Sequence, residues 1–71
     1  MKLGTYQHSK TGNFYRALAL AKHSETLEDL VIYECLYDNP RCKTWVRPLK
    51  MFLEDVIIDD KKVPRFIFIE A

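Results

Sequence analysis

Turn signals divide this chain of 71 residues into short apolar runs, and this spacing restricts the fold more than any other feature. Thr11-Gly12-Asn13 separates the first two runs, Asp38-Asn39-Pro40 interrupts the middle of the chain, and Asp59-Asp60-Lys61-Lys62 precedes the last run. No internal repeat, low-complexity tract or linker is evident. We therefore expect residues 1–71 to form one small, mostly β domain.

Five runs have the composition of β-strands: Leu3 to His8, Phe14 to His23, Leu30 to Tyr37, Thr44 to Arg47, and Pro64 to Glu70. In the second run, alternation would place the odd-numbered residues from Tyr15 to His23 on one face. The same run is rich in Ala and Leu, which also favour a helix.

A helical turn is expected between Pro48 and Asp55. Leu49, Phe52, Leu53 and Val56 are spaced as one helical stripe, and Pro48 is tolerated in a first turn. Four strands, a helical turn and a final strand are the order of a small SH3-like barrel of about five strands with one short helical turn.

The formal net charge of +1 implies no nucleic-acid partner by itself. The charges are unevenly distributed, because 25–38 is acidic and 41–50 is basic. This pattern indicates either one acidic and one basic side or ordinary solvated strand edges. No run is long enough to span a membrane, and the first residues lack the apolar core of a secretory signal. We expect a cytoplasmic protein with reduced cysteines, either a monomer or a weak homodimer.

The sequence contains no recognisable metal or cofactor motif. His8, His23, Cys35 and Cys42 lack the spacing of a zinc site, and Cys35 is better interpreted as a small buried apolar residue. A glycine-rich phosphate loop is absent. We therefore expect no metal and no cofactor.

Trp45-Val46-Arg47-Pro48 is the most informative stretch for function. Alternation along a strand would place Trp45 and Arg47 on one face, where a flat ring and a guanidinium can stack on a base or hold an anion. The alternative is that Trp45 belongs to the core and that Arg47 pairs with an acid such as Glu54.

His23-Ser24-Glu25 resembles catalytic residues only at first sight. Adjacent residues on an extended segment point in opposite directions, and a catalytic triad is defined by geometry rather than by adjacency. The alternative is a loop in which Ser24 and Thr26 bond to backbone groups.

Six motifs in order resemble the short bacterial proteins called domain of unknown function 1653. The resemblance runs from Gly4 to Phe66. The motifs are Gly4-x-Tyr6-x-His8, Gly12-Asn13-x-Tyr15, Ala21-x-His23-Ser24-Glu25-Thr26-x-Glu28, Val31-x-Tyr33-x-x-Leu36-Tyr37, Trp45-Val46-Arg47-Pro48-x-x-Met51-Phe52-x-Glu54 and Val63-Pro64-Arg65-Phe66. The resemblance implies a stand-alone bacterial domain and no activity, since that family is uncharacterised. It draws attention to five polar motif residues: His8, His23, Glu25, Arg47 and Arg65.

These observations predict a binding module without catalysis, whose ligand is an anion such as a nucleic acid, a nucleotide or an acidic peptide. Trp45, Arg47 and Arg65 are the main expected contacts, with His8, His23 and Glu25 as further site residues. Lys43 and Lys50 would add electrostatic support. Two alternatives remain open: a small hydrolase or nucleotide-processing enzyme using His23 and Glu25, and a protein-interaction or dimerisation module using exposed aromatic residues.

Overall fold

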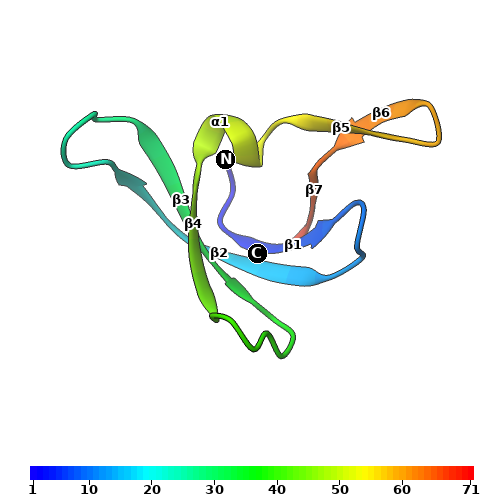
Figure 1. Ribbon diagram of the computed structural model, residues 1–71, viewed down its shortest axis with the longest axis horizontal. Helices are drawn as coiled ribbons and strands as arrows, with labels where there is room; N and C mark the ends of the chain where they lie inside the picture. The colour runs from blue at the N-terminus through cyan, green and yellow to red at the C-terminus, as the bar shows by residue number, and fades with distance from the viewer.

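The computed structural model describes residues 1–71 and contains two antiparallel sheets and one short helix (Figure 1). The main sheet has five strands in the order β4-β3-β2-β1-β7, and β5 pairs with β6 in a separate hairpin. In chain order the elements are β1 (Gly4–His8), β2 (Phe14–Lys22), β3 (Asp29–Cys35), β4 (Thr44–Pro48), α1 (Leu49–Phe52), β5 (Asp55–Ile58), β6 (Lys61–Pro64) and β7 (Phe66–Glu70).

The mostly β class, the five-stranded main sheet and the helical turn after Pro48 are confirmed. The expected SH3-like barrel, however, is not closed. The sheet is strongly curved (Figure 1), but its edge strands β4 and β7 pair only with β3 and β1. β4 is short and ends in Pro48, which has no N–H to continue a ladder. The chain then forms the β5–β6 hairpin before it reaches β7.

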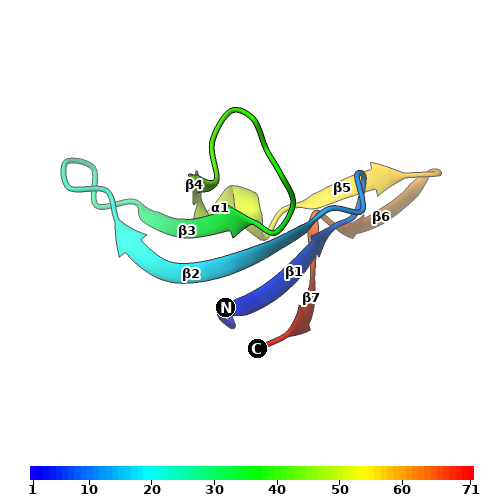
Figure 2. The same cartoon turned by 90° about the horizontal axis from the view of Figure 1, so that it is seen from below.

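The β5–β6 hairpin was missed by the sequence analysis, which expected only its charged turn. Asp59 and Asp60 both have positive φ, 50° and 62°, as the two central residues of a type I′ hairpin turn require. The signal for a strand was the β-branched run Val56-Ile57-Ile58 before this turn. The hairpin extends away from the main sheet in both views (Figures 1 and 2).

The core is built from aromatic rings on the concave side of the sheet. Phe52 of α1 stacks on Phe66 of β7, with ring centroids 4.1 Å apart. Tyr6 and Tyr33 meet Phe52 edge-on at 5.2 and 5.5 Å. Val31 below them is fully buried. Each ring buries a large apolar area, which allows a chain of this size to form a core with few residues.

β2 is a strand, but its pairing with β3 is shifted by a bulge. Ala17 lies opposite Tyr33, whereas Ala19 lies opposite Ile32, so that one extra residue is inserted at Leu18. Beyond the bulge Leu20 lies opposite the buried Val31. The pairing register therefore shifts after Ala17, although the odd positions remain less exposed than the even ones along the whole strand.

Candidate functional site

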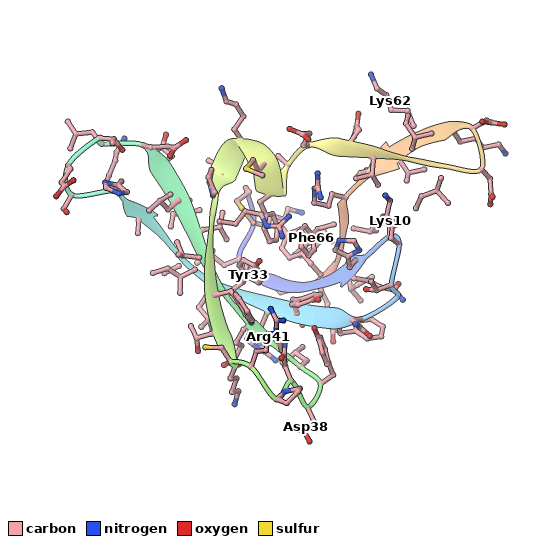
Figure 3. The ribbon with its side chains drawn as sticks, viewed as in Figure 1. Lys10, Tyr33, Asp38, Arg41, Lys62 and Phe66 are labelled. Atoms are coloured by element: carbon pink, nitrogen blue, oxygen red, sulfur yellow. The ribbon has the colours of Figure 1, made fainter.

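A small cavity lined by aromatic rings lies on the concave side of the sheet, next to the loop between β3 and β4. Its volume is about 190 Å³. Its lining residues are Tyr15, Tyr33, Cys35, Tyr37, Asn39, Trp45 and Arg47. Figure 3 shows Tyr33 and Phe66 within the curve of the sheet. Pockets for whole small-molecule ligands are roughly 300–1,000 Å³, so this cavity is suited to a single flat ring.

Strand pairing brings these rings together. Tyr15 of β2 lies opposite Cys35 of β3, and Tyr33 of β3 lies opposite Trp45 of β4. Opposite residues share a face, and Arg47 is two positions beyond Trp45. The expectation that Trp45 and Arg47 share a face is met, because both line this cavity.

Arg47 is the one cationic residue in the lining of this cavity. Its guanidinium carbon lies 5.7 Å from the centroid of the Phe66 ring, within the range of a cation–π contact. No carboxylate pairs with Arg47. The alternative in which Arg47 pairs with Glu54 is therefore wrong.

Arg65 forms that ion pair instead. Its terminal Nη2 lies 3.3 Å from Oε1 of Glu54, and the side chain is only 23% exposed. Its Nε is buried and has no hydrogen-bond partner. The backbone N–H of Arg65 also donates to the Glu54 carbonyl at 3.0 Å, which joins the base of the β5–β6 hairpin to the start of β7. Arg65 is thus partly neutralised, and Arg47 is not.

Trp45 is half-buried and serves both the core and the cavity. Its ring packs against the core cluster, and its indole N–H donates to the carbonyl of Cys42 at 3.0 Å. This bond fixes the ring beside the cavity. The expectation that Cys35 is buried is confirmed, and its thiol and that of Cys42 are both free.

His8 lies beside the same group of side chains. Its ring meets the Phe66 ring edge-on at 4.9 Å. The backbone N–H groups of Lys10 and Thr11 donate to its Nδ1 at 3.1 and 3.5 Å. Nδ1 therefore acts as an acceptor, and the ring proton is on Nε2.

Burial lowers the pKa of His8, and the positive charges of Arg47, Arg65 and Lys10 lower it further. A field of this sign at a neutral imidazole is favourable for a bound anion.

The lining of the cavity also contains a chain of polar groups. The hydroxyls of Tyr15 and Tyr37 are 3.0 Å apart. Burial, followed by this hydrogen bond, raises the pKa of Tyr15 to about 12, so its hydroxyl keeps its proton at neutral pH. Asn39 accepts the backbone N–H of Arg41 at 3.0 Å through Oδ1, which turns its amide nitrogen toward Tyr37.

The structure places His23 and Glu25 in the β2–β3 turn, outside this group. Nδ1 of His23 accepts the backbone N–H groups of Glu25 and Thr26 at 3.2 and 3.3 Å. Glu25 is exposed, and its side chain forms no hydrogen bond or ion pair. The local contacts of His23 are those of a turn-forming residue. Thr26 accepts the Glu28 backbone N–H as the loop interpretation expected, whereas the Ser24 side chain forms no such bond.

The two supporting lysines also lie outside the cavity lining. Lys43 is 3.9 Å from Glu34, and Lys50 of α1 lies beside a shallow hollow that it shares with Glu28 and Asp29. Lys43 thus pairs with an acid, and Lys50 lies near two acidic residues. The basic segment of the sequence is therefore not one continuous surface.

A larger cavity of about 400 Å³ lies between the β1–β2 turn and the β5–β6 hairpin. Ile58, Val63 and Ile67 supply its apolar lining, and Asp59 and Lys61 supply opposite charges. His8 lines it, but Trp45 and Arg47 do not. Of the residues expected to bind an anion, only Trp45 and Arg47 line the smaller cavity.

Sequence analysis missed the tyrosines and Asn39 as site residues. Tyr15, Tyr33 and Tyr37 all occur in the family motifs, and Asn39 precedes a proline in a turn. The alternating spacing of Tyr33, Cys35 and Tyr37 in the third run is a signal that would place them on one side of a strand. Only the pairing register shows that this side meets Trp45.

These features define a small, mostly β domain with an open, strongly curved sheet and a ring-lined cavity on its concave side. Residues 4–68 match the family model described as Protein of unknown function (DUF1653), and the chain belongs to this family. A crystal structure of a protein belonging to DUF1653 from Bordetella bronchiseptica is similar, with 35% sequence identity and a TM-score of 0.90. The match covers 97% of this chain and 87% of that chain.

Family membership confirms the resemblance carried by the motifs, and it assigns no activity. None of the curated proteins compared with the chain is similar to it. No helix of this protein has the length and apolar character needed to cross a membrane.

Proposed function

We propose that this domain binds single-stranded nucleic acid, with one base in the ring-lined cavity and a neighbouring phosphate on Arg47. The observation that carries the proposal is the unpaired guanidinium of Arg47 beside a cavity of about 190 Å³ lined by four aromatic residues. Stacking of a base on aromatic rings contributes about 1–3 kcal/mol per base and tolerates many sequences. A guanidinium matches the geometry of a phosphate through two parallel hydrogen bonds.

The local charge supports an anion despite the small net charge. Arg47, Arg65 and Lys10 all lower the pKa of His8 through their positive charge, after the larger effect of burial. Glu54 offsets only Arg65. Figure 3 shows Lys10 and Arg41 on two different loops near the concave side. A cationic ligand for these rings would meet this field with repulsion.

The hydrolase alternative has no supporting observation, because His23 and Glu25 lie in a turn outside the cavity lining. An acidic peptide shares the charge of a nucleic acid but does not use the rings. It serves below as a control ligand.

The proposal is tested by fluorescence anisotropy with a labelled single-stranded RNA of mixed sequence, at about 50 and 200 mM salt. Affinity should fall with salt, with a slope of about −0.7 for each phosphate contacted. Arg47→Gln should weaken binding about tenfold, as expected for loss of a charged hydrogen bond, and reduce the slope by about 0.7. Lys50→Gln removes the same charge away from the cavity and should change the affinity by less than about twofold.

Thermal melting of the same proteins separates binding from folding. Arg47→Gln loses only the cation–π contact with Phe66, about 0.5–1 kcal/mol, so the variant should remain folded. Absence of salt-sensitive RNA binding by the parent protein would refute the proposal. Equal affinity for polyglutamate and RNA would also refute it, because the rings would then contribute nothing.

A further inference from the structure

The hydrogen-bonding groups that line the cavity are mostly donors. The Arg47 guanidinium and an amide such as that of Asn39 offer N–H groups, and no carboxylate lines the cavity. Tyrosine hydroxyls can donate or accept. A base placed here meets more donors than acceptors.

Asn39 is held with its amide nitrogen toward the cavity. Its Oδ1 is occupied by the backbone N–H of Arg41 at 3.0 Å, and a backbone N–H can only donate, which fixes the orientation of the amide. Nδ2 is left with the Cys35 sulfur at 3.6 Å and the Tyr37 hydroxyl at 3.5 Å. Sulfur is a weak acceptor, and 3.5 Å is long for a hydrogen bond. The amide N–H groups are therefore poorly satisfied by the protein.

The two tyrosine hydroxyls retain one proton that can be donated to a ligand. Tyr15 and Tyr37 share one hydrogen bond of 3.0 Å, which uses one of their two protons. Tyr15 also has a side-chain hydrogen bond with Asn13, and Asn39 presents nitrogen to Tyr37, so the second proton is available on the Tyr37 hydroxyl. No acid pairs with the Arg47 guanidinium, which is left for the neighbouring phosphate.

We infer, on the basis of the proposed function, that the cavity selects bases with a carbonyl at the edge over bases with an amino group there. Uracil and guanine present O4 and O6 as acceptors, whereas cytosine and adenine present N4–H₂ and N6–H₂ as donors. A carbonyl satisfies Asn39 Nδ2 and the free tyrosine proton. An amino group sets donors against donors, and both sides remain unpaired in a partly dehydrated cavity.

Four RNA homopolymers of about eight nucleotides, a typical site size for such domains, test this inference. Oligouridine is compared with oligocytidine, and oligoinosine with oligoadenosine, since each pair exchanges a carbonyl for an amino group on one ring type. The carbonyl member should bind about tenfold more tightly in both pairs. Equal affinity within both pairs overturns the inference and leaves the proposed function standing. Absence of binding by all four overturns the proposed function itself.

Asn39→Asp provides the sharper test. The carboxylate keeps an oxygen for the Arg41 N–H and replaces the amide donor with an acceptor. The carbonyl preference should fall to about threefold or less, with oligocytidine gaining relative to oligouridine. Lys50→Gln lowers the net charge by the same unit and should leave the preference ratio unchanged. Tyr37→Phe, which keeps the ring and removes the hydroxyl, should also reduce the ratio. An unchanged ratio in both Asn39→Asp and Tyr37→Phe contradicts the inference.

Discussion

The β1–β2 turn and the β2–β3 turn are built by the same six-residue device in different surroundings. In His8-Ser9-Lys10-Thr11-Gly12-Asn13, the histidine Nδ1 accepts two backbone N–H groups and the threonine hydroxyl accepts a third. In His23-Ser24-Glu25-Thr26-Leu27-Glu28, the same three bonds recur fifteen positions later. Two backbone hydrogen bonds close each turn. The histidine N–H donates to the carbonyl of the sixth residue, and the N–H of the fifth residue donates to the histidine carbonyl.

The two copies differ in what surrounds the histidine ring. His8 packs edge-on against Phe66 and lies in the field of Arg47, Arg65 and Lys10. His23 has no aromatic neighbour at comparable distance and contacts its own turn. The same local chemistry therefore leaves one histidine packed against the aromatic core and the other in an exposed hairpin turn. The comparison shows that a histidine in a motif acquires its role from tertiary packing.

Replacing each histidine in turn by alanine should give the largest difference in stability between the two turns. His23→Ala removes only a local cap and should lower the free energy of unfolding by about 1 kcal/mol, by analogy with helix caps. His8→Ala also removes the ring packed on Phe66, so the expected loss is about 2–3 kcal/mol. Urea unfolding measures both values.

His8→Asn is the matched control, because its Oδ1 can replace Nδ1 as the acceptor for Lys10 and Thr11. It should recover about 1 kcal/mol of the loss in His8→Ala. Equal losses in the two alanine variants would show that packing adds nothing to the first turn.

Substitution of the fifth residue of each turn should change the free energy of unfolding by a smaller amount, with opposite signs in the two turns. Gly12 has φ of 76° and Leu27 has φ of 63°, a region that costs a non-glycine residue about 1–2 kcal/mol. Gly12→Leu should therefore destabilise the domain by about 1 kcal/mol, since a Cβ at this position meets only the Gln7 side chain at 3.9 Å.

Leu27→Gly should stabilise the domain by up to about 1 kcal/mol, reduced by the greater entropy of glycine in the unfolded chain. The leucine is 67% exposed, so little packing is lost. Melting temperatures of both variants against the parent protein provide the measurement. Destabilisation by Leu27→Gly would show that the entropy cost of glycine exceeds the strain relieved at this position.

The repeated device also shows what sequence analysis missed and why. The sequence analysis found no internal repeat, yet His-Ser-x-Thr occurs at His8 and at His23. Four residues are too short for a repeat search on a scale of whole structural units, which begins at about 20 residues. Composition indicated strands and turns because the β-branched and aromatic runs are local signals. The β5–β6 hairpin was not predicted, because its turn has two aspartates where asparagine and glycine are usual.

The candidate site was predictable in part. Alternation placed Trp45 and Arg47 on one face, and the structure agrees. The ion-pair partner of Glu54 was not predictable, because the sequence gives no reason to prefer Arg65 over Arg47. Only the course of the chain after α1 brings Arg65 to Glu54. The bulge at Leu18 likewise depends on the pairing of β2 with β3 rather than on the residues of β2 alone.

Acidification should give the smallest difference between the turns, and its sign follows from the lowered pKa of His8. Burial, Arg47, Arg65 and Lys10 hold that pKa below the ordinary value of 6.5 in the folded protein. The unfolded chain therefore takes up a proton first as the pH falls, and the free energy of unfolding decreases from about pH 6.5 downward. Above this range the histidine is neutral in both states, and its contribution is fully present.

His8→Asn should flatten this decrease between about pH 7 and 5.5, before the carboxylates titrate. Urea unfolding across this range for the parent protein and His8→Asn measures the difference. Identical slopes would show that the three cations and the burial of the ring do not act on His8 in solution.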